Sequence, residues 1–387
     1  MNRNLVIFII LWLLSLAGIS FYGGPVSYGL FFFLTVTPLI SLIYILIVII
    51  RFRIYQRLDA ANLICGRDSD FYFTLQNEGP VGFFGVKVRF YSSFSTISGI
   101  DDGVEYELTP GTGIQKHTGL LCKYRGEYEV GIKQVMISDC FRLFTVSYKN
   151  REPLRVNVKP DLIMLNELKS AELALSTSRE QLTNPTEPDI LVREYVTGDD
   201  LRKVNWKATA SAGKLMIRKT IGEEQQGIGL MIDSKRFSDS NFDYIPVESK
   251  MLETVLALTL FFTEKRTPIT VYSMSGILSE DAVERGSRFD SFYEKMSAFA
   301  FSGSTDTGRM YSEILRQGTI FQKKAVFIVT HEFNEENRLM ALELSSVSIP
   351  VIVCVVSDDP GSNDPDIRLP GMTLVKISTD SDITEVL

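Results

Sequence analysis

The chain of 387 residues carries a formal net charge of −7 and two histidines, His117 and His331. The acidic balance argues against a nucleic-acid-binding protein, which would need a basic surface, and the scarcity of histidine limits imidazole-based metal sites and catalytic triads. The four cysteines are scattered without metal-type pairs, which suits free intracellular thiols better than a disulfide framework.

The first 57 residues predict a membrane hairpin. No charged side chain lies between Arg3 and Arg51, and the apolar run is broken once, at Tyr22 to Pro25. We therefore predict two transmembrane helices, at about residues 5–21 and 28–50, each near the roughly 20 residues that a bilayer core requires.

Arginine placement predicts the orientation of this hairpin. Arg3 precedes the first span, three arginines follow the second at positions 51, 53 and 57, and the connecting turn has no charge. The positive-inside rule then makes the protein multi-pass in the cell membrane, with its soluble domains in the cytoplasm. A single anchor, cleaved or retained, is the alternative and would reverse the topology.

Residues 58–160 predict an antiparallel β-sandwich-like domain. Short runs alternate apolar and polar side chains, and Gly- and Asn-rich turns separate them, a pattern typical of such domains. We interpret His117 as a solvent-facing residue. Asp139 precedes a cluster of aromatic and aliphatic side chains, which we interpret as packing at the edge of the sandwich. Residues 161–192 read as a linker.

Residues 193–387 combine a charged loop with an α/β domain. Asp199 or Asp200 can cap a helix over residues 201–212, Gly213 can end it, and a buried strand is expected at 215–219. Near-continuous apolar strands then alternate with helices, which predicts an open, mostly parallel sheet covered on both faces. The strands are expected at 228–233, 269–273, 325–330, 351–356 and 373–377, and the helices at 247–265, 289–299, 309–317 and 335–344.

Ligands of such sheets bind beyond the carboxyl ends of the strands. Here those ends carry Asp233 and Lys235 after one strand, and Thr330, His331 and Glu332 after another. Carboxylate and hydroxyl oxygens would suit Mg²⁺, but Lys235 brings a positive charge close to Asp233. A metal-free edge, with Asp233 paired to a lysine or capping a turn, is favoured. His331 and Glu332 could form an acid–base pair, although a surface-loop histidine is the preferred interpretation.

The charged loop resembles the signature of a bacterial family, domain of unknown function 58. The matching residues are Arg193, Glu194, Tyr195, Gly198, Asp199, Arg202, Asn205 and Trp206. Residues 125–128 and 139–144 are similar to segments of the same proteins, with Arg142 where glycine is usual. The resemblance implies a membrane hairpin, a β-rich segment and a C-terminal sheet resembling a von Willebrand factor A domain. It also implies a protein partner, either a MoxR-type AAA+ ATPase or a transglutaminase-like membrane protein, because both are often encoded near such proteins.

The resemblance also implies a degenerate metal site and no cofactor. Intact von Willebrand A domains bind a metal through D-x-S-x-S after the first strand and an acidic residue after a later one. In this chain the first motif reads DSKRF at residues 233–237, and His331 follows Thr330 at the later position. Only Asp233 is retained, so a metal-free interaction domain is expected.

Two classes of function are compatible with the sequence. The first is a membrane-anchored cytoplasmic scaffold or adaptor for a protein partner in cell-envelope upkeep. The second is a metal-dependent hydrolase acting through Glu194, Asp199 and Lys207, although the mixed charges of the loop can neutralise one another, and no catalytic residue is assigned. The loop is also compatible with a purely structural ion-pair network in which Trp206 is a buried anchor.

Overall fold

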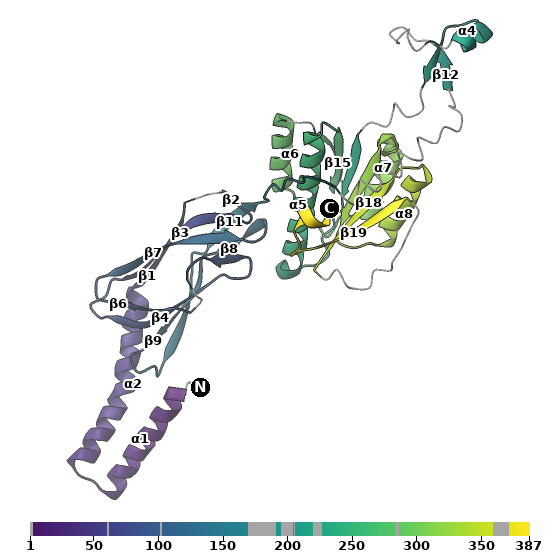
Figure 1. Ribbon diagram of the computed structural model, residues 1–387. Helices are drawn as coiled ribbons and strands as arrows, with labels where there is room; N and C mark the ends of the chain where they lie inside the picture. The colour runs from purple at the N-terminus through teal and green to yellow at the C-terminus, as the bar shows by residue number, and fades with distance from the viewer. Residues whose placement is uncertain are drawn as a thin grey trace. The chain divides into compact units, whose positions relative to one another are not determined.

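The computed structural model describes residues 3–59, 62–100, 103–168, 191–194, 204, 206–219, 227–283, 286–358 and 371–387. The chain divides into two compact units, Met1–Asp161 and Leu162–Leu387. Figure 1 traces both units from the N-terminus in purple to the C-terminus in yellow.

Two apolar helices open the first unit, α1 (Arg3–Phe21) and α2 (Pro25–Arg51). Gly23 and Gly24 adopt φ angles of 60° and 88°, which glycine tolerates best, and Pro25 supplies a rigid first helical residue. Trp12 Nε1 of α1 donates a hydrogen bond of 3.0 Å to Thr35 Oγ1 of α2. Both helices are long and apolar enough to cross a membrane, as a signal sequence can also be. The prediction of two N-terminal apolar helices is confirmed.

The rest of the first unit is β-rich, as predicted. In its described part, the strands form sheets with the orders β1-β3-β7-β5, β10-β9-β4-β6 and β2-β11-β8. The two four-stranded sheets are antiparallel throughout. The strands are β1 (Phe52–Leu58), β2 (Asn62–Ile64), β3 (Asp68–Asn77), β4 (Phe83–Phe90), β5 (Ser95–Ile97), β6 (Glu105–Leu108), β7 (Gly113–Cys122), β8 (Gly126–Val130), β9 (Ile132–Ser138), β10 (Thr145–Lys149) and β11 (Leu154–Lys159).

The two four-stranded sheets share one hydrophobic core. Phe73 of β3 packs edge-on against Phe90 of β4, with ring centroids 5.6 Å apart, and against Tyr106 of β6 at 6.4 Å. Alternating side chains of each strand point into this core, as the period-two pattern predicts. Val48 of α2 is fully buried in the same cluster, so the end of α2 packs with the sheets formed by β1 to β11, which we call the β unit.

Two sequence predictions in this unit can be compared with the structure. His117 is exposed and bonds Asp70 through Nε2 at 2.9 Å, as expected of a solvent-facing residue. The turn after β9 is only partly as predicted: Leu143 is buried, but Phe141 faces out. Arg142 has a φ of 54°, a left-handed conformation that glycine adopts more readily than other residues.

The second unit contains a short ribbon and an α/β domain. β12 (Leu191–Glu194) and β13 (Met216–Lys219) pair antiparallel, with α4 (Trp206–Ala212) between them. Gly213 ends α4 with a φ of 66°, as predicted. The strand expected at 215–219 is not a strand of the large sheet, because β13 pairs with β12 in a sheet of two strands.

The α/β domain is built on a sheet with the order β16-β15-β14-β17-β18-β19. Its strands are parallel except for the edge strand β16, which runs antiparallel to β15. Helices α5 and α6 pack on one face and α7 and α8 on the other, each over its own core. The elements are β14 (Ile228–Ile232), α5 (Asn241–Glu264), β15 (Ile269–Ser275), β16 (Ile277–Val283), α6 (Ser287–Ser297), α7 (Thr307–Gln317), β17 (Ala325–Thr330), α8 (Glu335–Ser346), β18 (Val351–Ser357) and β19 (Met372–Ser378).

Candidate functional site

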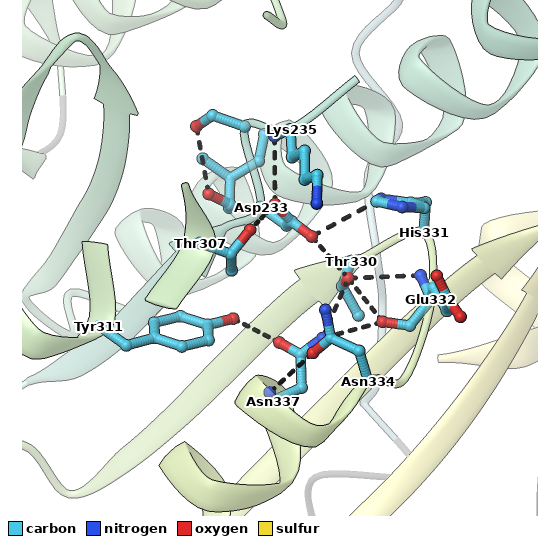
Figure 2. A network of polar contacts seen from close by, with 11 residues as sticks. Asp233, Lys235, Thr307, Tyr311, Thr330, His331, Glu332, Asn334 and Asn337 are labelled. Atoms are coloured by element: carbon cyan, nitrogen blue, oxygen red, sulfur yellow. Dashed lines mark hydrogen bonds and ion pairs between the residues drawn. The ribbon is translucent and has the colours of Figure 1, made fainter. Parts of the chain in front are cut away.

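The polar cluster at the carboxyl edge of this sheet is centred on Asp233. Strand β14 is buried along its whole length and delivers Asp233 directly after its last residue, so the carboxylate is 1% exposed. Burial of a carboxylate is costly unless hydrogen bonds compensate it. Here its environment supplies these bonds (Figure 2).

Both carboxylate oxygens of Asp233 have donors. Oδ1 accepts hydrogen bonds from the backbone N–H of Lys235 at 3.1 Å and from Thr307 Oγ1 at 2.9 Å. Oδ2 accepts from Thr330 Oγ1 at 3.0 Å, and His331 Nδ1 lies 3.6 Å away. Asp233 therefore caps a turn, as predicted, and joins segments that lie far apart in the sequence.

Local sequence explains how these donors are positioned. Thr307 is the first residue of α7, whose N-cap Asp306 accepts a hydrogen bond from the backbone of Arg309. Thr330 is the last residue of β17, the parallel neighbour of β14. Since neighbouring parallel strands end at the same edge, Asp233 and Thr330 are brought together by topology alone.

A second layer of contacts holds Thr330. The side-chain amide of Asn337, at the start of α8, donates to the Glu332 carbonyl at 2.8 Å and lies 3.4 Å from Thr330 Oγ1. The hydroxyl of Tyr311 donates to Asn337 Oδ1, and burial raises the pKa of this phenol well above its ordinary value. Tyr311 thus acts as a neutral hydrogen-bond donor.

The loop after Asp233 is held from its other side. Ser302 and residues 234–236 exchange backbone hydrogen bonds of 3.1 Å. Arg236 forms a bidentate ion pair with the buried Glu248 of α5, at 2.7 and 3.1 Å, and lies over the ring of Tyr244. These contacts fix the backbone that presents Lys235 and Phe237 at the surface.

His331 differs from its sequence interpretation. Its side chain is 11% exposed and stacks on Phe237 with ring centroids 5.1 Å apart, so it is not a surface-loop histidine. Burial lowers the pKa of His331, although the negative charge of Asp233 opposes this shift. The expected alternative pair with Glu332 is not formed either. Glu332 is exposed and contributes its backbone carbonyl to the cluster.

The residues at this edge do not fit a metal ion. Asp233 is the residue whose carboxylate takes part in the described contacts of this cluster, because Glu332 takes part through its backbone, and the Asp233 oxygens face hydroxyl and N–H donors. Hard cations such as Mg²⁺ or Ca²⁺ require several oxygen ligands, commonly more than one carboxylate. No group of three or more acidic, histidine or cysteine side chains able to hold a metal occurs in the described part of the chain.

Sequence analysis did not single out Thr307, Tyr311 and Asn337. Their hydroxyl and amide groups are common in loops and helix starts, and their chemistry emerges only when the fold joins them. One usable local signal was Asp306 as an N-cap, which places Thr307 at the beginning of a helix.

The signature residues of the charged loop lie mostly outside the described residues, namely Tyr195, Gly198, Asp199, Arg202 and Asn205. Arg193 and Glu194 belong to β12, where they pair with Ile217 and Met216. Trp206 begins α4 and is 72% exposed, so the interpretation of this residue as a buried anchor is wrong. Lys207 is also exposed.

Fold and site together define a chain with two apolar N-terminal helices, a β-rich body and an α/β domain whose strand edge is closed by a buried, fully hydrogen-bonded aspartate. The family model described as protein of unknown function DUF58 matches residues 191–271, a range that begins at β12 and includes the signature loop and Asp233. This match supports the family resemblance for residues 191–271 of the chain.

Other comparisons add little. No curated protein matches the chain. Among solved structures, it is similar to the cupredoxin domain of amoB from Nitrosocaldus yellowstonii, at 8% identity over 30% of this chain and 97% of that chain, with a TM-score of 0.20. It is also similar to trypsin-activated alpha-2-macroglobulin from Escherichia coli, at 13% identity over 39% of this chain and 9% of that one, with a TM-score of 0.22.

Proposed function

We propose that the protein is a membrane-anchored scaffold whose α/β domain binds a MoxR-type AAA+ ATPase in the cytoplasm, in the service of cell-envelope upkeep. The apolar helices α1 and α2 support the anchor. Arg3 at the start of α1, and Arg51, Arg53 and Arg57 at and after the end of α2, support a cytoplasmic orientation for both ends of the hairpin. The family resemblance supports the choice of partner.

We further propose that the α/β domain is of the von Willebrand factor A type, in a form that recognises its partner without a metal. In favour of this are the mostly parallel sheet, Asp233 after β14, and Thr307 at the start of α7, which supplies a hydroxyl to the same point. Lys235 replaces the first serine of the D-x-S-x-S motif, so an ammonium group follows Asp233 where a hydroxyl ligand would be needed.

The observation that carries the proposal is the enclosure of Asp233 by donors from three segments. These bonds fix the loops at the sheet edge before any partner arrives, which lowers the entropy lost on binding. The loop after β14 exposes Phe237 at 44%, two residues after the charged Lys235, and Phe242 in the first turn of α5 is 66% exposed. Aromatic and cationic groups on a fixed backbone are typical of the centres of protein interfaces.

The alternative of a metal-dependent hydrolase finds no support. Asp199 lies outside the described residues, Lys207 is exposed on α4, and the comparisons offer no hydrolase relative among curated proteins.

The test uses the full-length protein in lipid nanodiscs and the purified MoxR-type ATPase encoded by the same genome. We expect saturable binding that weakens about tenfold in Phe237→Ala and in Lys235→Glu, a loss of roughly 1.4 kcal/mol. Val347→Ala is the matched control, since Val347 is 49% exposed but lies at the far end of α8. Absence of binding by the intact protein, or binding by both edge variants as tight as that of the intact protein, would overturn the proposal.

A further inference from the structure

The last turns of α2 have two apolar faces with different surroundings. One face is buried against the β unit through Ser41, Ile45 and Val48. On the opposite face each side chain is more than half exposed, namely Leu39, Ile40, Leu42, Ile43, Leu46 and Ile50. An exposed apolar stripe of this length needs an apolar environment, so this part of α2 is covered on one side by protein and on the other by another apolar phase.

Hydrogen bonds tie two loops of the β unit to this part of α2. Ser41 Oγ donates to the buried carboxylate of Asp139 at 2.9 Å. Tyr44 donates from its hydroxyl to the Gly82 carbonyl at 3.0 Å and accepts from the backbone N–H of Phe84 at 3.0 Å. The turn after β9 and the start of β4 are therefore fixed at one level of the helix.

These two loops expose apolar side chains beside their attachment points. Val81 is 37%, Phe84 46% and Phe141 55% exposed. Asp139 accepts hydrogen bonds from the backbone N–H groups of Phe141 and Phe144, at 3.1 and 2.7 Å, which rigidifies the turn that carries Phe141. We call Val81, Phe84 and Phe141 the loop patch.

The register of the hairpin gives the level of the loop patch. Trp12 contacts Thr35, and Arg3 lies nine residues before Trp12 just as Tyr44 lies nine residues after Thr35. In two antiparallel helices, Arg3 and Tyr44 are therefore at the same height. The 19 residues of α1 extend about 28 Å at 1.5 Å per residue, close to the roughly 30 Å of a hydrocarbon core. Arg3 then marks one membrane boundary, and tyrosine is a residue typical of that boundary.

We propose that the loop patch inserts into the headgroup layer of the bilayer that the hairpin crosses, so that the β unit rests on the membrane surface. This inference rests on the proposed membrane anchoring. Lipid is the occupant because the loop patch is tied by hydrogen bonds to α2, whose opposite face is the exposed apolar stripe, and because the attachment point Tyr44 lies at the level of Arg3. Insertion ends at the headgroup layer, since loop backbone needs hydrogen-bond partners that the hydrocarbon core does not supply.

The test measures the depth of single tryptophans in nanodiscs of phosphatidylcholine and phosphatidylglycerol, in a Trp12→Phe, Trp206→Phe background. Phe84→Trp and Phe141→Trp are introduced separately, and thermal unfolding confirms that each variant keeps its fold. We expect their emission to be quenched by lipids brominated near the headgroup end of the acyl chains, and to be protected from acrylamide in the water.

Lys123→Trp is the matched control. Lys123 is exposed and follows β7 at the end of the sheet away from α2, nine strand residues or about 30 Å along β3 from the helix junction. The emission of the tryptophan at residue 123 should be quenched by acrylamide and unaffected by brominated lipid. A Trp206→Phe variant that retains Trp12 reports on the hairpin itself.

The outcomes separate the two proposals. Lipid quenching at residues 84 and 141 but not at 123 supports the inference. No lipid quenching at 84 and 141, with Trp12 still quenched, overturns it and leaves the anchor intact. If Trp12 is also unquenched, the membrane anchoring fails. Acrylamide protection at residues 84 and 141 without lipid quenching would show a protein or a second copy on the loop patch, which also overturns the inference.

Discussion

Thr307 and Asp233 are 74 residues apart in the chain, yet Thr307 Oγ1 donates a hydrogen bond of 2.9 Å to Asp233 Oδ1 in the buried edge of the α/β sheet. This bond links the start of α7 to the end of β14. Because the carboxylate is almost fully enclosed, each of its donors contributes to the stability of the edge as well as to its shape.

Replacing Thr307 by valine should destabilise the α/β domain. Valine keeps the volume but removes the donor, which leaves a buried carboxylate oxygen short of one hydrogen bond at a loss of about 2 kcal/mol. Native-state hydrogen exchange of the β14 and β17 amides in the full-length protein measures the change. Ser312→Ala on the exposed side of α7 is the control and should leave exchange unchanged, as Ser312 bonds only within its own helix among described contacts. Equal protection in Thr307→Val and the unaltered protein would contradict this role.

His331 should make the stability of the α/β domain depend on pH. Burial lowers the pKa of His331 below its ordinary value of 6.5, so the unfolded chain takes up a proton at a higher pH than the folded chain. The free energy of unfolding is therefore highest above pH 6.5, where His331 is neutral in both states. It falls as the pH drops through 6.5 toward the lowered pKa of the folded protein. Asp233, Glu332 and Glu248 oppose the shift in pKa and Lys235 adds to it.

Comparison with a His331→Gln variant isolates this contribution. Melting temperatures are measured between about pH 7.5 and pH 5.5, and the decrease should be smaller in the variant. Carboxylates elsewhere titrate equally in both proteins, so they cancel in the difference. A decrease of the same size in the two proteins would show that His331 is not responsible.

Trp206 should behave as a tryptophan in water. It is 72% exposed at the start of α4, whereas Trp12 packs against Phe31 within the hairpin. In a Trp12→Phe protein, the emission of Trp206 should be red-shifted and readily quenched by acrylamide. Blue-shifted, protected emission would instead support the structural-anchor interpretation of the charged loop, or a partner already bound there.

Local sequence patterns sufficed for much of the α/β domain. β17 was predicted with its observed bounds because a buried parallel strand is a continuous apolar run between clear loop signals. β16 was missed, since the polar residues in Ile277–Val283 suit an edge strand that becomes recognisable only through its pairing with β15. The start of α5 was placed too late, because Pro246 suggests a helix beginning, whereas the helix already starts at Asn241, five residues earlier.

The site was harder to predict than the fold. Asp233 is visible in the sequence because it ends an apolar strand, and its capping role follows from that place. Its partners Thr307 and Thr330 come from other elements, and the distance between them depends on strand order. The burial of His331 depends on Phe237, which stacks on it from a loop that local periodicity does not describe.

The edge of the sheet should become a metal site when the replaced ligands are restored. We expect Mg²⁺ to leave the melting temperature of the unaltered protein unchanged, since one carboxylate surrounded by donors offers too few ligands. The triple variant Lys235→Ser, Phe237→Ser, His331→Asp removes the ammonium group and adds two hydroxyls and a second carboxylate around Asp233. Its melting temperature should fall without metal, because two carboxylates then share a buried site, and rise with added Mg²⁺ or Mn²⁺. Adding Asp233→Ala to the triple variant is the control and should abolish the metal response. If Mg²⁺ stabilises the unaltered protein and Asp233→Ala alone removes that effect, the edge already binds metal and the metal-free mode of recognition is wrong.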